Sequence, residues 1–200
     1  KDEDGLALTA QAEELFGDSP VYRTYASAAV GNILNRYMKR NDYSGSFAVL
    51  EKYRAQLDEG DYRDMYEGTL VNSLNYAVST QPLAESLALI TQNKPALPEK
   101  EYVKLASFAY SNAAADIADT GAWLDAASLL DRGLQAFPGD GTLVKQRGIY
   151  RRNYAAEVHN RADQLYNSGD RQGALNAVQQ GLMQVSDSSI LQNDLKRLQQ

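Results

Sequence analysis

The sequence contains no cysteine, a single histidine and no long hydrophobic run, and each absence removes a class of protein. Without cysteine there can be no disulfide framework, no thiol nucleophile and no Cys-ligated zinc or iron–sulfur site. No apolar run approaches the roughly 18 to 20 residues that span a bilayer, and no signal-peptide pattern opens the chain. We therefore expect a soluble segment that is not directly inserted in a membrane.

Basic residues are also few, since 20 Lys and Arg stand against 26 Asp and Glu and the net charge is −6. A nucleic-acid partner is disfavoured, because binding a phosphate backbone needs clustered Lys and Arg. The absence of cysteine fits a bacterial extracytoplasmic, periplasmic location better than the cytoplasm. A chain of 200 residues can also lack cysteine by chance, so the compartment stays open.

What the chain does contain is helical patterning interrupted by short turns rich in Gly, Pro, Asn and Asp. The apolar fraction of 44% and the charged fraction of 23% are typical of globular proteins. Sustained alternation of Val, Ile and Thr is missing, so no sheet is expected. The pattern predicts an all-α protein.

Four segments align without a gap and predict repeated units of helix, turn and helix. Each contains an asparagine in its first helix, and the first three are evenly spaced while the last interval is longer: Asn32, Asn72, Asn112 and Asn160. Nine residues after each asparagine stands a residue compatible with a turn: Asn41, Gln81, Gly121 and Gly169. Fourteen residues after each stands a small residue: Ser46, Ser86, Ala126 and Ala174.

These units resemble tetratricopeptide repeats, which pair two antiparallel helices and place small residues around the turn. The third unit matches the family at Ala114, Gly121, Ala126 and Pro138, and the fourth at Ala162, Gly169 and Ala174. The first two units depart from it, with Leu34 and Leu74 at a position where small residues are usual. The resemblance implies an α-solenoid of antiparallel helix hairpins wound into a right-handed superhelix; a related helical-hairpin solenoid is the alternative.

The repeat spacing divides the chain into six intervals. Residues 1–19 resemble the end of a truncated preceding repeat, 20–58 and 59–98 are repeats similar to the family, 99–140 and 141–187 are its closest matches, and 188–200 form a capping helix. The capping helix would place Ile190, Leu191, Leu195 and Leu198 on one side, after an N-cap at Asp187 or Ser188. The two ends predict that the chain belongs to a longer polypeptide.

The asparagines lie opposite the predicted packing stripe of their helices. At 100° per residue, Val30, Leu34 and Tyr37 share one narrow arc, and Asn32 lies roughly 160° to 200° from it. In the family the first helices line a concave groove, so the resemblance implies a row of four asparagines there. Helices pack about 8–10 Å apart and an extended peptide rises about 3.3 Å per residue, so each asparagine would meet every third residue or so. A primary amide complements a peptide unit because it donates and accepts hydrogen bonds.

Flanking positions would add selectivity to this peptide-binding groove. The residues predicted to line it, besides the four asparagines, are Asn35, Asn75, Lys39, His159, Asp163 and Asn167. Only Lys39 among them is basic, so recognition of an acidic carboxyl terminus by a basic clamp is not supported. The alternative is that the asparagines hold the hairpins together through bonds to neighbouring backbone.

The function predicted from these observations is protein or peptide binding by a non-enzymatic scaffold. No set of nucleophile, base and oxyanion donor is visible, and His159 has no second histidine or cysteine with which to hold a metal, so no catalytic residue, cofactor or metal site is expected. Lys145, Arg147, Arg151 and Arg152 form one basic segment, either a solvated helix face or a patch for an acidic partner. The rival functions are a self-associating homo-oligomeric module and a docking or regulatory arm of a larger enzyme or membrane-anchored protein.

Overall fold

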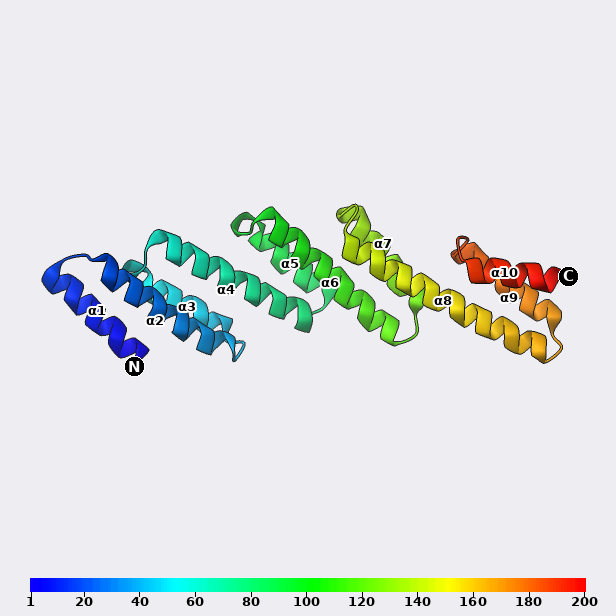
Figure 1. The fold of residues 1–200 in the computed structure, drawn as a ribbon, viewed down its shortest axis with the longest axis horizontal. Coiled ribbons are helices and arrows are strands. Elements are labelled where there is room, and N and C mark those ends of the chain that lie inside the picture. The colour runs from blue at the N-terminus through cyan, green and yellow to red at the C-terminus, as the bar shows by residue number, and fades with distance from the viewer. The chain divides into compact units, whose positions relative to one another are not determined.

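The computed structural model describes the whole chain, residues 1–200, and consists of ten α-helices and two short 3-10 helices without any strand (Figure 1). The α-helices are α1 Asp2–Phe16, α2 Pro20–Met38, α3 Tyr43–Tyr53, α4 Glu59–Thr80, α5 Leu83–Asn93, α6 Glu99–Asp119, α7 Trp123–Ala136, α8 Gly141–Asn167, α9 Arg171–Gln184 and α10 Ser189–Gln199. The 3-10 helices are η1 Arg54–Gln56 and η2 Lys94–Ala96. The predicted all-α class is confirmed. None of the helices combines the length and the apolar character that crossing a bilayer requires.

The chain forms two compact units, Lys1–Leu105 and Ala106–Gln200, whose boundary falls inside α6. Each unit is described separately below. The predicted intervals each contain whole helices: α1 lies in 1–19, α2 and α3 in 20–58, α4 and α5 in 59–98, α6 and α7 in 99–140, α8 and α9 in 141–187, and α10 in 188–200. Every interval between the two ends thus holds one helix pair.

Three of the four predicted turns have the same backbone conformation. Asn41, Gly121 and Gly169 adopt positive φ angles of 57°, 83° and 90°, the left-handed region that glycine and asparagine tolerate best. The turn between α4 and α5 differs, because Gln81 is extended with a φ of −111°. Its neighbour Pro82 explains the difference, since a residue that precedes proline is driven into extended conformations.

Aspartate side chains begin the helices that follow two of these turns, α3 and α9, and also begin α8. The Oδ1 atom of Asp42 accepts a hydrogen bond from the Gly45 amide at 2.8 Å, and Asp170 accepts one from Gly173 at 2.8 Å. Asp140 accepts from two amides at the start of α8, each at 3.0 Å. These carboxylates satisfy amide groups that have no partner inside the helix, so the sequence marks these three helix starts locally.

In the first unit, α2 packs against α1 and α3 and runs parallel to α4. Its core includes the buried side chains of Leu6, Val30, Ile33, Leu34 and Leu50. The Ser27 hydroxyl donates to the Asp61 carboxylate, and the Asn72 amide lies 3.7 Å from the sulfur of Met38. Both contacts join residues 34 positions apart, so α2 and α4 run in the same direction with an offset of 34 residues.

In the second unit, one set of contacts occurs twice. A β-carbon added to Gly181 of α9 would lie 2.8 Å from Val158 of α8 and 2.9 Å from Leu191 of α10. The same construction at Gly133 of α7 would meet Tyr110 of α6 and Leu143 of α8, each at 3.0 Å. The two sets are related by a single shift along the sequence, in which Tyr110, Gly133 and Leu143 correspond to Val158, Gly181 and Leu191. The arrangement of α6, α7 and α8 therefore recurs in α8, α9 and α10.

The C-terminal helix α10 takes the place in the second set that α8 takes in the first. Leu191 and Leu198 are buried against α8 and α9, Leu195 is half-buried, and Ile190 is 37% exposed at the start of the helix. The hydroxyl of Ser188 accepts the amide of Leu191 at 3.5 Å, as the predicted N-cap requires. The predicted terminal helix and its apolar side are therefore present, except that Ile190 stays partly in solvent.

The crossing at Gly181 generates a stability prediction. We expect Gly181→Ala to destabilise the protein by roughly 1–3 kcal/mol, because its methyl group overlaps Val158 and Leu191 inside a packed interface. The control is Gly148→Ala in α8, where the added β-carbon meets only the flexible end of Arg152 at 3.4 Å. This control should gain about 0.5–1 kcal/mol from helix propensity. Urea unfolding followed by circular dichroism measures both, and equal stability of the two variants would contradict the close crossing.

Candidate peptide-binding surface

The four asparagines occupy the side of their helices that faces away from the local core. Residues two before or two after them are buried, including Val30, Leu34, Leu70, Leu74, Ala114 and Ala162. Asn32, Asn72 and Asn160 are exposed, and Asn112 is half-buried. The helix faces therefore agree with the sequence geometry, whereas binding of a peptide by these side chains stays a prediction.

In the first unit, Asn32 and Asn72 do not lie side by side, because they stand at different positions along the axes of the packed helices α2 and α4. Asn72 lies beside Met38, and this 34-residue offset sets it six residues further along the helix pair than Asn32. Six residues correspond to about 9 Å along the helix axis, and the spacing of about 8–10 Å between the helices lies at right angles to it. The two side chains are thus separated by roughly four residues of extended peptide instead of three.

In the second unit the difference is larger. The Ser111 hydroxyl donates to Gln146, so α6 and α8 are offset by 35 residues and Asn112 lies level with Arg147. Asn160 stands several turns beyond Arg147 on the same helix, which corresponds to roughly 20 Å along α8. Asparagine spacing in the sequence therefore does not translate into a level row across neighbouring helices.

The amide of Asn72 has a local partner. Its nitrogen donates to the carbonyl of Gly68, one turn earlier in α4, at 2.8 Å. This bond stays within one helix, and the same nitrogen also lies 3.7 Å from the sulfur of Met38 in α2. Asn72 also borders an open depression with Val71, Gly68 and the acidic residues Asp64, Glu67 and Glu101.

The other predicted residues of the first unit lie on its surface. Asn35 and Lys39 are exposed near the end of α2, and Asn75 is half-buried in α4. Asn32 lies next to the ion pair between Asp2 and Arg36. The hydrogen bond from Arg36 is the main reason that the pKa of Asp2 lies below its ordinary value, and the Asn32 amide lowers it further.

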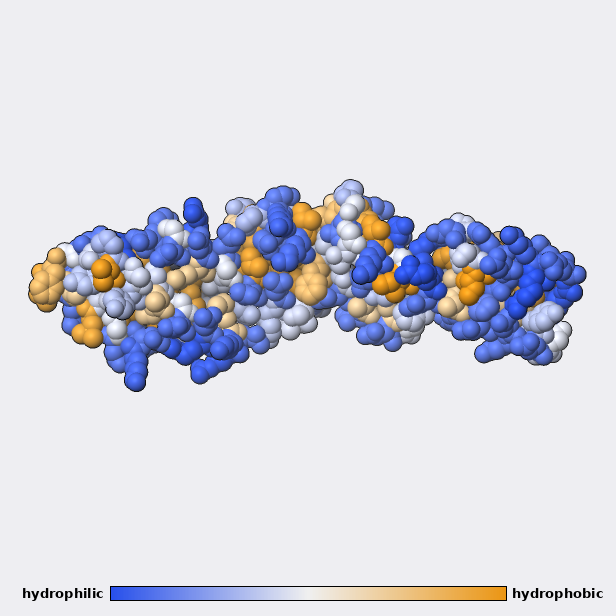
Figure 2. Space-filling view, in the orientation of Figure 1, coloured by the Kyte–Doolittle hydropathy of each residue, from blue (hydrophilic) through white to orange (hydrophobic).

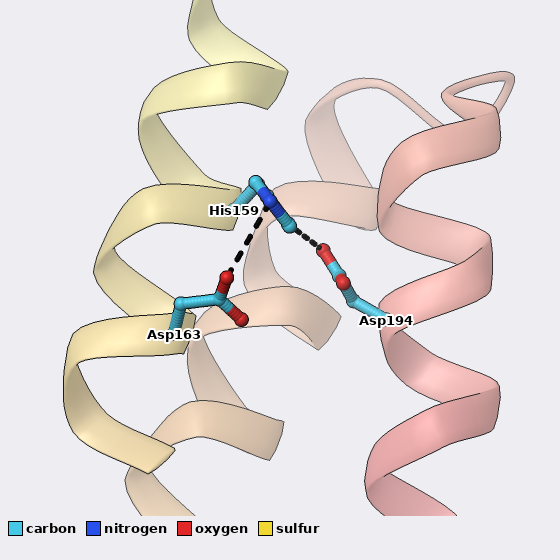
Figure 3. A group of neighbouring side chains, drawn as sticks. All are labelled: His159, Asp163 and Asp194. Atoms are coloured by element: carbon cyan, nitrogen blue, oxygen red, sulfur yellow. Dashed lines mark hydrogen bonds and ion pairs between the residues drawn. The ribbon is translucent and has the colours of Figure 1, made fainter. Parts of the chain in front are cut away.

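His159 and Asp163 belong to an ionic network between α8 and α10 (Figure 3). The Nδ1 atom of His159 lies 2.6 Å from the buried carboxylate of Asp194, and its Nε2 atom lies 3.5 Å from Asp163. Arg197 bonds Asp163 and lies 3.2 Å from Asp194. The hydrogen bond from Arg197 lowers the pKa of Asp163. These two predicted groove residues therefore fasten α10 to α8.

The same three side chains form a cluster of potential metal ligands. Ligand atoms of His159, Asp163 and Asp194 all lie within 4.8 Å of one another. The guanidinium of Arg197 already lies against both carboxylates and supplies positive charge there. The geometry thus fits a salt-bridge network that positions a helix, because the cation that both carboxylates need is part of the chain.

Asn160 belongs to a set of amides along α8 whose other members, Asn153 and Gln164, were not among the predicted groove residues. Asn153, Asn160 and Gln164 border one open depression of about 720 Å³, together with Trp123 from the start of α7. Their spacing of seven and four residues places the three amides on one face of the helix. Trp123 is half-buried, with its ring centroid 6.1 Å from that of Tyr150. The spacing of the amides was visible in the sequence, whereas the presence of Trp123 beside Asn160 required the structure.

Asn167, the last predicted residue, is exposed at the end of α8 and does not border this depression. Comparison of the chain with models of known protein families, with curated proteins and with solved structures gives no match. The function is therefore argued from the geometry of these surfaces.

The local bond of Asn72 predicts a small effect of its removal on folding. We expect Asn72→Ala to change the free energy of unfolding by less than about 0.5 kcal/mol, because the lost bond is exposed and alanine favours a helix more than asparagine does. Thermal and urea unfolding measure the change. A loss of about 2 kcal/mol or more would instead identify Asn72 as a structural residue of the hairpin.

The lowered pKa of Asp163 predicts a dependence on pH. Because its pKa is lower in the folded chain than the ordinary value of 3.8, the ion pair with Arg197 stabilises the fold above that pH. We expect Asp163→Asn to cost about 0.5–1 kcal/mol at pH 7. The deficit should shrink below pH 4 and vanish as pH falls through the lowered pKa.

Urea unfolding at pH 7, 5 and 3.5 measures this deficit. The matched control is Asp116→Asn on α6, an exposed aspartate without an ion pair, which should show no such trend. A deficit that stayed constant between pH 7 and 3.5 would contradict the role of the charge.

Proposed function

We propose that the helix pairs stack as an α-solenoid of the tetratricopeptide type, a right-handed superhelix of antiparallel hairpins. Two observations support this arrangement. Successive first helices are offset by 34 residues in the first unit and by 35 residues between α6 and α8 in the second, close to the usual repeat length of that family. The glycine crossing of α6, α7 and α8 recurs at the equivalent residues of α8, α9 and α10.

We propose further that the protein binds an extended segment of a partner protein or peptide and has no catalytic role of its own. The observation that carries this proposal is the row of Asn153, Asn160 and Gln164 beside Trp123 on α8. Primary amides pair with the N–H and C=O groups of a peptide backbone and do not depend on its side chains. An adjacent indole offers a flat apolar surface for one side chain of the partner.

The spacing of the amides suits an extended chain that runs along α8. Asn153 and Asn160 are seven residues apart, or about 10.5 Å along the axis, close to three residues of extended peptide. Asn160 and Gln164 are separated by about 6 Å, close to two residues. A peptide laid on this face would therefore meet a second amide after about three residues and a third after about two more.

Charges of both signs border the same depression, namely Glu157 and Arg161. They would select side chains at the edges of the peptide without requiring one net charge. Backbone recognition with such mixed edges gives tolerance of different sequences, as a scaffold for several partner segments needs. The proposal requires no cofactor and no metal.

The test uses peptides selected from a display library of random twelve-residue sequences against the whole chain. Fluorescence anisotropy of the selected peptides compares wild type with the double variant Asn160→Ala, Gln164→Ala. We expect binding to weaken about ten-fold or more, because each lost amide removes about 0.5–1.5 kcal/mol of hydrogen bonding. Methylation of alternate backbone nitrogens of the peptide should weaken binding similarly, since it removes donors from the backbone.

The matched control is Gln179→Ala, Gln180→Ala, which removes two exposed amides from α9 outside the depression. Circular dichroism first establishes that all variants have equal helicity and melting temperature. Equal affinity of wild type and the Asn160, Gln164 variant would refute this surface as the binding site. A selection that yields no binding peptide would refute peptide binding itself.

A further inference from the structure

The second unit contains a second cavity, of about 570 Å³, beside the first half of α8. Its other walls come from the connection that follows α9, including Val185 and Asp187, and from the start of α10, including Ile190. Figure 2 shows strongly hydrophilic and hydrophobic residues side by side over α8 and the start of α10. The volume lies in the range of about 300–1,000 Å³ that is usual for ligand pockets.

The cavity exists because α8 is much longer than the helices that pack on this part of it. α8 has 27 residues, whereas α9 has 14 and α10 has 11, which corresponds to about 40, 21 and 17 Å. Arg151 of α8 bonds Asp187, just before α10, at 2.7 Å. Helix α10 therefore begins near the middle of α8, and the first three to four turns of α8 extend past it.

The floor and walls of the cavity include apolar groups that remain in contact with solvent. Val144 is 49% exposed and Ile190 is 37% exposed, whereas Ala155 and Val185, which also border the cavity, are buried. Gly148 leaves space at the floor of the cavity, since a β-carbon there would meet only the end of the Arg152 side chain. An aliphatic side chain of a partner would remove this apolar surface from water.

Positive charge gathers around this apolar surface. Arg147, Arg151 and Arg152 all border the cavity, in a chain whose net charge is −6. Arg147 pairs with Asp131 and Arg151 with Asp187, each at 2.7 Å, whereas the exposed Arg152 makes no ion pair. The only acidic residue that borders the cavity is Asp187.

Asp187 already demonstrates how the cavity acts on a carboxylate. Its pKa lies below the ordinary value, first because Arg151 donates a hydrogen bond to it, and also because the charge of Arg147 attracts its ionised form. A second carboxylate placed near Arg152 would meet the same field together with a guanidinium that has no partner.

This cavity lies mostly on another side of α8 than the amide surface proposed above, and Ala156 is the one residue that borders both. Val144, Gly148, Arg151 and Ala155 lie roughly 160° to 220° around α8 from Asn153, and therefore on the opposite side of the helix. The inference drawn from it does not depend on peptide binding at Asn153, Asn160 and Gln164.

We propose that this cavity is a docking site for an acidic peptide segment that carries an aliphatic side chain. The aliphatic side chain lies on the cavity floor beside Gly148, and a flanking carboxylate pairs with Arg152. The apolar wall favours a peptide over a nucleic acid, which would need basic residues along a longer track than these turns of α8 provide. The basic segment noted in the sequence is thus a patch for an acidic partner, and its free member is Arg152.

The probe is a labelled, acetylated and amidated peptide with two glutamates on either side of a central leucine. Its affinity for the whole chain is measured by fluorescence anisotropy in 50 mM salt, alongside a peptide with glutamine in place of every glutamate. We expect Arg152→Gln to weaken binding about two- to five-fold, as loss of one exposed ion pair implies. Gly148→Met should abolish binding because it fills the floor without changing any charge.

The matched control is Arg132→Gln, which removes an exposed arginine of α7 that borders neither cavity and makes no ion pair. It should bind the acidic peptide as wild type does, and the glutamine peptide should bind at least ten-fold more weakly than the glutamate peptide. Equal losses in Arg152→Gln and Arg132→Gln, or unchanged binding in Gly148→Met, would overturn the proposal in favour of unspecific attraction.

An additional experiment with lipid vesicles distinguishes a peptide partner from an anionic membrane surface. The chain is sedimented with vesicles of phosphatidylserine and phosphatidylcholine. If it sediments with the vesicles but does not bind the acidic peptide at concentrations up to about 1 mM, the arginines serve a lipid surface and the peptide proposal is overturned. Circular dichroism of each variant shows that it is folded. Loss of peptide binding at the amide surface in the earlier experiment would leave these outcomes unchanged, because the two surfaces share no substituted residue.

Discussion

The close approach of each second helix to two first helices, at a residue without a β-carbon, is the constraint on which the second unit depends. Gly133 and Gly181 each allow contact distances that no other residue would accommodate without a shift of the neighbouring side chains. At that separation the longer polar side chains of consecutive first helices reach one another. Ser111 then meets Gln146, and at the equivalent positions of the following helices His159 meets Asp194.

Unequal helix lengths decide which surfaces of α8 are available. The second half of α8 is fastened to α10 by Leu191, Leu198 and the network of His159, Asp163, Asp194 and Arg197. The first half has no such neighbour on that side and exposes an apolar strip edged with arginines. Its other side presents amides next to Trp123. One helix therefore separates a polar, nearly neutral surface from an ionic and apolar one.

The two surfaces would differ in how they respond to solution conditions. Hydrogen bonds between amides and a peptide backbone depend weakly on ionic strength, because neither group is charged. Attraction of a carboxylate to Arg152 at an exposed site weakens as salt is added, because charges farther apart than about 8 Å are largely screened at physiological ionic strength. A partner that used both surfaces would combine backbone recognition, which tolerates many sequences, with an ionic contact that distinguishes acidic segments from others.

The sequence by itself determined the helices, most of their turns and the faces that they bury, because these features rest on local preferences and on the period of the α-helix. Asn41, Gly121 and Gly169 occupy left-handed turns for reasons that lie within a few residues. The Gln81 turn departs only because proline follows it. The apolar side of α10 was likewise readable from the spacing of its leucines.

Only the tertiary structure decided which residues from different helices come together. The repeated asparagines suggested a level row, whereas the packed helices are offset by 34 and 35 residues, fewer than separate those asparagines in the sequence. It also decided that His159 has Asp194 as its partner, that Trp123 borders the amides of α8, and that a cavity opens beside Arg152. These relations depend on how deeply side chains of one helix fit between those of another. The pattern along a single helix states which face is buried but does not state how far the next helix slides along it.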